Sequence, residues 1–275
     1  MTTTLEPTRP DLAAVKQRQQ QTWASGDFSM VAARIVIVAE QLCDVADLHA
    51  GWRVLDIATG SANAAIAAAR LGCTAVGVDY VPALLDQGRR RAEVEGLLVD
   101  LREGDAESLP FRDGSFDAVT SVFGCMFAPD HDRAAAELLR VCRPGGTIAL
   151  ASWTPDGFVG ELFRTVAAHV PPPAGVPSPM LWGSASYLRR LLGDGIASLE
   201  VTERTFTFRF PSAEDFVTFF RRWYGPTLKA FATLDGEASE ALELDLIALA
   251  DRFDRLGSDA IAIPATYLEA VATRS

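Results

Sequence analysis

Apolar residues in the middle of the chain form short continuous runs that alternate with longer runs of helical periodicity. VLDIA, TAVGVD and TIALASW are three of the short runs, and glycine, proline or polar residues bound them. Such runs are typical of buried strands, and their alternation with helices predicts a parallel sheet of right-handed βαβ units. The predicted strands are 53–58, 74–79, 99–105, 116–123 and 147–153, and the predicted helices between them are 62–71, 82–95 and 130–142.

The flanking segments are mainly helical. Periodicity predicts helices over 11–24 and over the apolar run 30–48, with a break at ASGDF between them. The alternating segment 199–210 predicts a strand whose phenylalanines share one face, whereas Leu199 and Val201 have the opposite parity, so we expect a bulge between the two groups. The remaining predictions are a helix over 186–192, a helical region over 213–255 broken at Gly225-Pro226 and near Asp235-Gly236, and a strand at the end of the chain.

Three residues mark helix ends. Ser61 is the expected N-cap of the helix 62–71, and Gly72 suits the position after its end. Pro82 is expected at the first position of the next helix, where a missing N–H is harmless.

Composition and charge narrow the class of protein. Of 275 residues, 49% are apolar, enough for a full core, and the formal net charge of −11 argues against a nucleic-acid footprint or a polybasic membrane surface. No apolar run is long enough to span a membrane, and no secretory signal opens the chain, so we expect a cytoplasmic protein. The four widely spaced cysteines predict buried, reduced thiols and no metal site, and we read the scarcity of lysine beside arginine as a genomic bias.

The turn after the first predicted strand carries the clearest chemical signal. In 58-ATGSANA-64 small residues allow close approach of a ligand to the backbone at a helix N-terminus. A dinucleotide and S-adenosylmethionine both fit such a turn followed by an acid. Asp56 lies four residues before Gly60, where it would repel a diphosphate but suits a cationic amino-acid tail. The spacing GxGxxG is absent, so the sequence favours S-adenosylmethionine.

Acids follow the next two strands. Asp79 ends the second strand, where it can accept both ribose hydroxyls; the alternative is an acid that caps the following helix. Asp105 and Ala106 end the third strand, where they can bind the exocyclic amine and ring of adenine, or form only a solvated turn.

Four stretches together resemble a known family. VLDIATGSAN, VGVDY, EGDAESLPFRDGSFDAVTS and LLRVCRPGGTIALASW, in this order, are similar to the signature regions of class I S-adenosylmethionine-dependent methyltransferases, most closely the ubiquinone/menaquinone-biosynthesis type. The resemblance covers 51–153 and implies an α/β, Rossmann-like, seven-stranded and mostly parallel sheet with an antiparallel last strand. It implies a helical cap over 1–50, a cofactor-binding core over 51–155, a mainly helical substrate-cavity insertion with one strand over 156–260, and the final strand over 261–275.

The resemblance also assigns residues to the cofactor. The first motif corresponds to Asp56, Ala58, Gly60 and Ala62, the ribose acid to Asp79 beside Tyr80, the adenine contacts to Asp105 and Ala106, and the backbone near Phe123 to the methionine ammonium. The family commonly has glycine where Ala58 and Ala62 stand, and alanine is tolerated there if φ stays negative.

Further candidates come from the cap and from the histidines. Trp23 and Phe28 are expected to fold over the cofactor and shield its sulfonium from water, or else to pack helices. Of three histidines, only His131 follows a strand on the cofactor side, so it is the candidate general base; a helix-capping or surface role is the alternative. The aromatic residues of 213–224 are expected to pack in the core or to line an apolar substrate cavity.

The sequence therefore predicts a methyltransferase that acts on a small, fairly apolar molecule, with oxygen as the expected acceptor atom. The expected partners are that molecule and no nucleic acid, and a homodimer is left open. Three alternatives stay open: an enzyme that uses the bound cofactor for decarboxylation or cyclisation, a dinucleotide oxidoreductase, and a regulatory binding module.

Overall fold

The sheet at the centre of the molecule contains seven strands among the residues described by the computed structural model, 10–258 and 260–275. Its order is β3-β2-β1-β4-β5-β7-β6, and β7 pairs antiparallel with both β5 and β6 while the other neighbours are parallel. The predicted mostly parallel sheet with an antiparallel last strand is confirmed. The strands are β1 Arg53–Ile57, β2 Thr74–Asp79, β3 Val99–Glu103, β4 Phe116–Val122, β5 Cys142–Trp153, β6 Ile196–Phe210 and β7 Ile261–Arg274.

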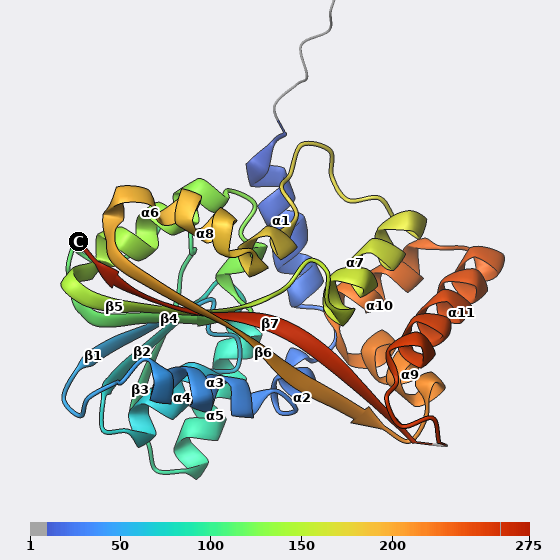
Figure 1. The fold of residues 1–275 in the computed structure, drawn as a ribbon, viewed down its shortest axis with the longest axis horizontal. Coiled ribbons are helices and arrows are strands. Elements are labelled where there is room, and N and C mark those ends of the chain that lie inside the picture. Colours follow the sequence, from blue (N-terminus) through green and yellow to red (C-terminus); the bar gives the residue numbers. More distant parts are fainter. Residues whose placement is uncertain (1–9, 259) are drawn as a thin grey trace, which may run out of the picture.

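Helices cover both faces of the sheet, as Figure 1 shows. One face carries α3, α4 and α5, and the other carries α6 and α8. A second group, α7 and α9 to α11, forms the helical half of the molecule, with α1 between this half and the sheet. The helices are α1 Leu12–Trp23, α2 Phe28–Ala32, α3 Val36–Val45, α4 Asn63–Arg70, α5 Pro82–Val94, α6 His131–Val141, α7 Phe158–His169, α8 Ala185–Leu192, α9 Ala213–Trp223, α10 Gly225–Thr233 and α11 Gly236–Phe253.

Strands β6 and β7 extend beyond the rest of the sheet toward α9 and α11 (Figure 1). The first residues of β7 pair only with β6, because its pairing with β5 begins at Tyr267. Pro264 therefore lies where β7 has one hydrogen-bonded neighbour, which a proline without N–H tolerates. This long ribbon connects the sheet to the helical half and brings aromatic residues of β6 toward the strand tips.

Strand order reverses beside β1, which has β2 on one side and β4 on the other. Both β1 and β4 are buried along nearly their whole length. In open α/β sheets ligands bind beyond the carboxyl ends of the strands at such a reversal. The fold thus places a binding crevice after Ile57.

Several local predictions are wrong. The apolar run 30–48 forms two helices, since the side-chain amide of Asn63 donates to the carbonyl of Ala32 and occupies the end of α2. Ser61 is not the N-cap of α4; Ala62 takes that position without a side-chain cap. The register shift in β6 lies at 196–198 rather than before the phenylalanines. Gly72, Pro82 and the two breaks in the region 213–255 lie where predicted.

Part of the predicted cap, residues 1–9, lies outside the described residues, as does residue 259. No helix in the described ranges is both long and apolar enough to cross a membrane. The four cysteines are buried and free, as predicted.

Candidate functional site

A deep cavity lies beyond the carboxyl ends of β1, β2 and β4 and beneath α1. We call it the strand-tip cavity; it holds about 960 Å³ of unfilled space, its open mouth included. Of the eleven residues assigned to the cofactor, Ala62 is buried and does not line the cavity. The other ten line it: Trp23, Phe28, Asp56, Ala58, Gly60, Asp79, Tyr80, Asp105, Ala106 and Phe123.

The turn between β1 and α4 follows an unusual backbone path. Ala58, Gly60 and Ala62 have φ of +52°, +55° and +70°, all in the left-handed region. The expectation that φ stays negative at the two alanines is therefore wrong. A left-handed conformation costs a residue with a Cβ about 1–2 kcal/mol. The turn stores this strain while the backbone comes close to the cavity.

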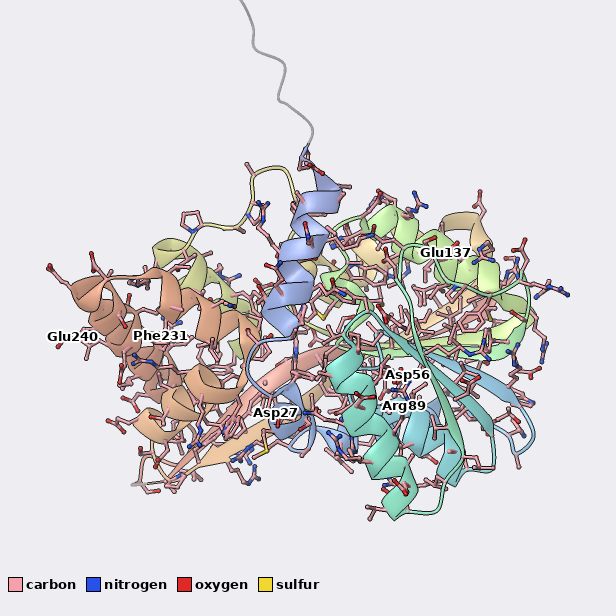
Figure 2. The ribbon with its side chains drawn as sticks, turned by 180° about the vertical axis from the view of Figure 1, so that it is seen from behind. Asp27, Asp56, Arg89, Glu137, Phe231 and Glu240 are labelled. Carbon is pink, nitrogen blue, oxygen red and sulfur yellow. The ribbon has the colours of Figure 1, made fainter. Side chains whose placement is uncertain are left out.

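Asp56 organises the turn from below. Its carboxylate accepts hydrogen bonds from the hydroxyls of Thr59 at 2.5 Å and Thr120 at 3.1 Å, and from the backbone N–H of Ala65 at 3.2 Å. The side chain is almost fully buried, and burial raises its pKa to about 6 against the opposing effect of these bonds. Asp56 thus joins β1, β4 and α4 while still lining the cavity (Figure 2).

Asp79 joins the turn to the tip of β2. One carboxylate oxygen accepts the backbone N–H of Gly60 and the other accepts that of Val81, each at 2.9 Å. Burial raises the pKa of Asp79 to about 6. An ionised carboxylate has about four acceptor positions, so two hydroxyls of a ligand can still bind to it.

A lysine that the sequence reasoning overlooked closes the far side of the cavity. Lys16 on α1 contacts Asp105 and Glu107, each at 2.5 Å, and the Glu107 side chain is only 5% exposed. The low number of lysines in the chain suggests a genomic bias, yet Lys16, one of only two lysines, lies in the site. Gln20 of the same helix donates to the carbonyl of Tyr80, so α1 is joined to two strand tips.

The lining has a clear charge balance. Four carboxylates line the strand-tip cavity against one cation, Lys16, which two of them already bind. A diphosphate would face mainly negative charge here, whereas a ligand with an ammonium and a sulfonium is favoured. The carboxylates are Asp56, Asp79, Asp105 and Glu107.

A second space, the aromatic chamber, adjoins the first. It holds about 490 Å³ of unfilled space, with the open space at its mouth included, and the described residues that line it are apolar or aromatic, none of them charged. The chamber is formed by residues of α1, α2, α7, α9, β5 and β6 and by loop residues near them. Five residues line both spaces and form a shared wall: Trp23, Phe28, Ile35, Phe123 and Phe127.

The aromatic residues of 213–224 divide between the two expected roles. Phe220 and Tyr224 line the chamber. Phe216 is fully buried in the core, and Phe219 packs beneath the guanidinium of Arg34 at 4.2 Å.

His131 lies apart from both spaces. It is the first residue of α6, 3% exposed, with Nδ1 at 2.8 Å from the hydroxyl of Tyr187 on α8 and its ring edge-on to Trp182. Burial lowers its pKa to about 4, so the ring is neutral at pH 7. Neither His49 nor His169 lines either space. The geometry therefore does not support the predicted general base, and His131 connects α6 to α8.

Comparisons with known proteins agree with the charge balance of the strand-tip cavity. A family model described as a methyltransferase domain matches residues 55–150. An uncharacterized protein of Mycobacterium tuberculosis is 41% identical over 236 residues, covering 84% of this chain and 86% of that one. Demethylmenaquinone methyltransferases of Deinococcus radiodurans and Thermus thermophilus are 39% and 38% identical over 144 and 161 residues. These matches cover 51% and 53% of this chain, and 60% and 73% of the length of those relatives. The structure of a SAM-dependent methyltransferase of Thermotoga maritima covers 90% of this chain and 97% of its own with a TM-score of 0.52 and 18% identity.

Proposed function

The chain belongs to the family of S-adenosylmethionine-dependent methyltransferases, and from this premise we propose that it methylates a small, largely apolar molecule bound in the aromatic chamber. The observation that carries the proposal is the shared wall. It makes the chamber the immediate neighbour of the cavity with the charge balance of a sulfonium site. The net charge of −11 supports a small acceptor over nucleic acid.

The cofactor supplies an electrophilic methyl group when bound. Asp79 accepts the two ribose hydroxyls, Asp105 and Ala106 bind adenine, and the backbone near Phe123 binds the methionine ammonium. Asp56, Ala58, Gly60 and Tyr80 form the adjoining surface, and Trp23 and Phe28 exclude water near the sulfonium. These roles rest on the position of each residue in the cavity lining.

The chamber also limits the acceptor. Among the described residues, no carboxylate, imidazole or amine lines it, so this part of the chain offers no strong base beside the acceptor. We propose oxygen as the acceptor atom, and among oxygens a phenolic hydroxyl, which ionises near pH 10 and needs less assistance than an aliphatic one. Alignment and exclusion of water then supply most of the catalysis.

The test uses the purified protein with methyl-deuterated cofactor and a panel of phenols, hydroquinones, aliphatic alcohols and amines. Mass spectrometry is expected to find one deuterated methyl group on oxygen in phenolic products. The control is the variant Asp79→Asn, which is expected to transfer less deuterated methyl to the products because it loses the carboxylate proposed to hold the ribose. Label found only on nitrogen or carbon would overturn the choice of oxygen, and an altered product without label would indicate the decarboxylation or cyclisation alternative.

A further inference from the structure

Few residues that line the aromatic chamber carry a polar side-chain atom. Among the described residues they are Tyr224, with its hydroxyl, and Trp23 and Trp153, each with an indole N–H. All three can donate a hydrogen bond, and none forms one with another described residue of the chain. A chamber with donors and no charged group suits a ligand that is apolar over most of its surface and carries an oxygen acceptor.

Tyr224 is held in place by backbone hydrogen bonds and by ring packing. It lies between α9 and α10, its N–H donates to the carbonyl of Phe220 at 3.0 Å, and its carbonyl accepts the N–H of Leu228 at 2.9 Å. Its ring packs edge-on against Trp23 and against Phe220, with centroids 5.6 Å apart in both pairs. The backbone and the ring are fixed on several sides, so the direction of the hydroxyl is largely set.

The hydroxyl of Tyr224 is open to a ligand. The residue is only 8% exposed, but its hydroxyl oxygen keeps accessible surface and forms no hydrogen bond with another described residue. Burial raises the pKa of Tyr224 well above its ordinary value, so the hydroxyl stays protonated and acts as a donor rather than as a base.

Tyr224 lies close to the wall that the chamber shares with the strand-tip cavity. Its ring contacts Trp23 and lies 6.3 Å from that of Phe28, and both of these residues belong to the shared wall. A ligand oxygen bound to Tyr224 therefore lies at the side of the chamber that adjoins the strand-tip cavity.

We propose that the Tyr224 hydroxyl donates a hydrogen bond to an oxygen of the methyl acceptor and turns that end of the molecule toward the shared wall. Tyr224 is then a positioning residue that selects oxygen-bearing ligands over hydrocarbons of the same shape. This inference rests on the proposed function, because it takes the chamber as the seat of the acceptor.

The test compares two probes of similar size, 1-tetralone and tetralin, which differ by one carbonyl oxygen. Their affinities are measured by calorimetry in the presence of saturating S-adenosylhomocysteine, for the wild type, Tyr224→Phe and the control Tyr267→Phe. Tyr267 lies outside both spaces and its hydroxyl has only a 3.4 Å contact with Gln41. We expect the wild type and the control to bind the ketone about 2- to 12-fold more tightly, the effect of one neutral hydrogen bond, and Tyr224→Phe to bind both probes with nearly equal affinity.

The ratio of the two affinities separates the proposal from a structural role. A variant that merely loosens the chamber would weaken both probes alike and keep their ratio, and that result would overturn the proposal. Equal binding of both probes by the wild type, or binding of neither, would overturn it as well. Because no turnover is measured, the labelling experiment decides the proposed methyl transfer separately.

Discussion

The strained alanines of the first turn allow a quantitative test of how this chain departs from its family. Ala58 and Ala62 both have positive φ, yet their methyl groups lie in different surroundings. Ala58 is partly exposed to the strand-tip cavity, whereas Ala62 is fully buried against Ile66, Leu85 and other apolar residues. Replacing each alanine by glycine removes the same backbone strain but not the same packing.

The expected magnitudes follow from these surroundings. Glycine removes about 1–2 kcal/mol of left-handed strain, which stabilises the folded state. It also raises the entropy of the unfolded chain, which destabilises the folded state by about 0.4–1 kcal/mol. Ala58→Gly is therefore expected to stabilise the protein by about 0.5–1 kcal/mol. Ala62→Gly also loses one buried methyl group, worth about 0.8 kcal/mol or more with the cavity it leaves, so its net effect is near zero.

Urea unfolding of the two variants and the wild type measures these differences directly. Ala58→Gly should raise the midpoint without changing the slope, and Ala62→Gly should leave it nearly unchanged. The reasoning is refuted if Ala58→Gly is less stable than the wild type, or if Ala62→Gly gains more than Ala58→Gly. Either result would mean that the turn does not store strain at position 58.

Four further predictions concern charged and buried groups. Burial raises the pKa values of Asp79 and Asp56 to about 6, so the affinity for S-adenosylhomocysteine, measured by calorimetry, should fall up to about tenfold per pH unit below 6. Asp79→Asn should lower the affinity at about pH 7.5 and weaken its dependence on pH. An unchanged pH profile in this variant would contradict the ribose assignment. The same shifts mean that the unliganded protein gains stability from these two carboxyls below about pH 4 and loses it as the pH rises through about 6, which thermal unfolding across pH can check. Lys16→Met should speed hydrogen exchange over α1 and weaken the binding of S-adenosylhomocysteine severalfold, because Glu107 loses its ion pair with Lys16. Exchange equal to that of the wild type would disprove the role of this contact. His131→Ala should lower stability by about 1–3 kcal/mol while leaving kcat unchanged, and a well-folded variant with reduced kcat would restore the predicted base.

The centre of the sheet could be predicted because β1, β2, β4 and the second half of β5 are largely buried and have mainly apolar sequences. The gap between α2 and α3 could not be predicted from the sequence, because no glycine or proline marks it. It depends on the hydrogen bond from Asn63 to Ala32 and on the guanidinium of Arg34 over the ring of Phe210 at 4.5 Å. Both contacts join segments far apart in the sequence, which local periodicity does not encode.

The cofactor side of the site was predictable for a related reason. Its residues follow strand ends, and parallel strands bring those ends to one edge, so Asp56, Asp79 and Asp105 meet by topology alone. Lys16 lies on a helix outside the sheet, and nothing in its local sequence indicates that α1 crosses the cavity. The histidine prediction used the correct edge of the sheet but not the depth of the side chain, which Tyr187 and Trp182 decide.

A crystal structure of the complex with S-adenosylhomocysteine tests the central claim most directly. The account predicts both ribose hydroxyls within hydrogen-bond distance of Asp79, adenine beside Asp105 and Ala106, and the sulfur facing the shared wall. A complex with the ligand outside the strand-tip cavity, or with Asp79 free of the ribose, would contradict it.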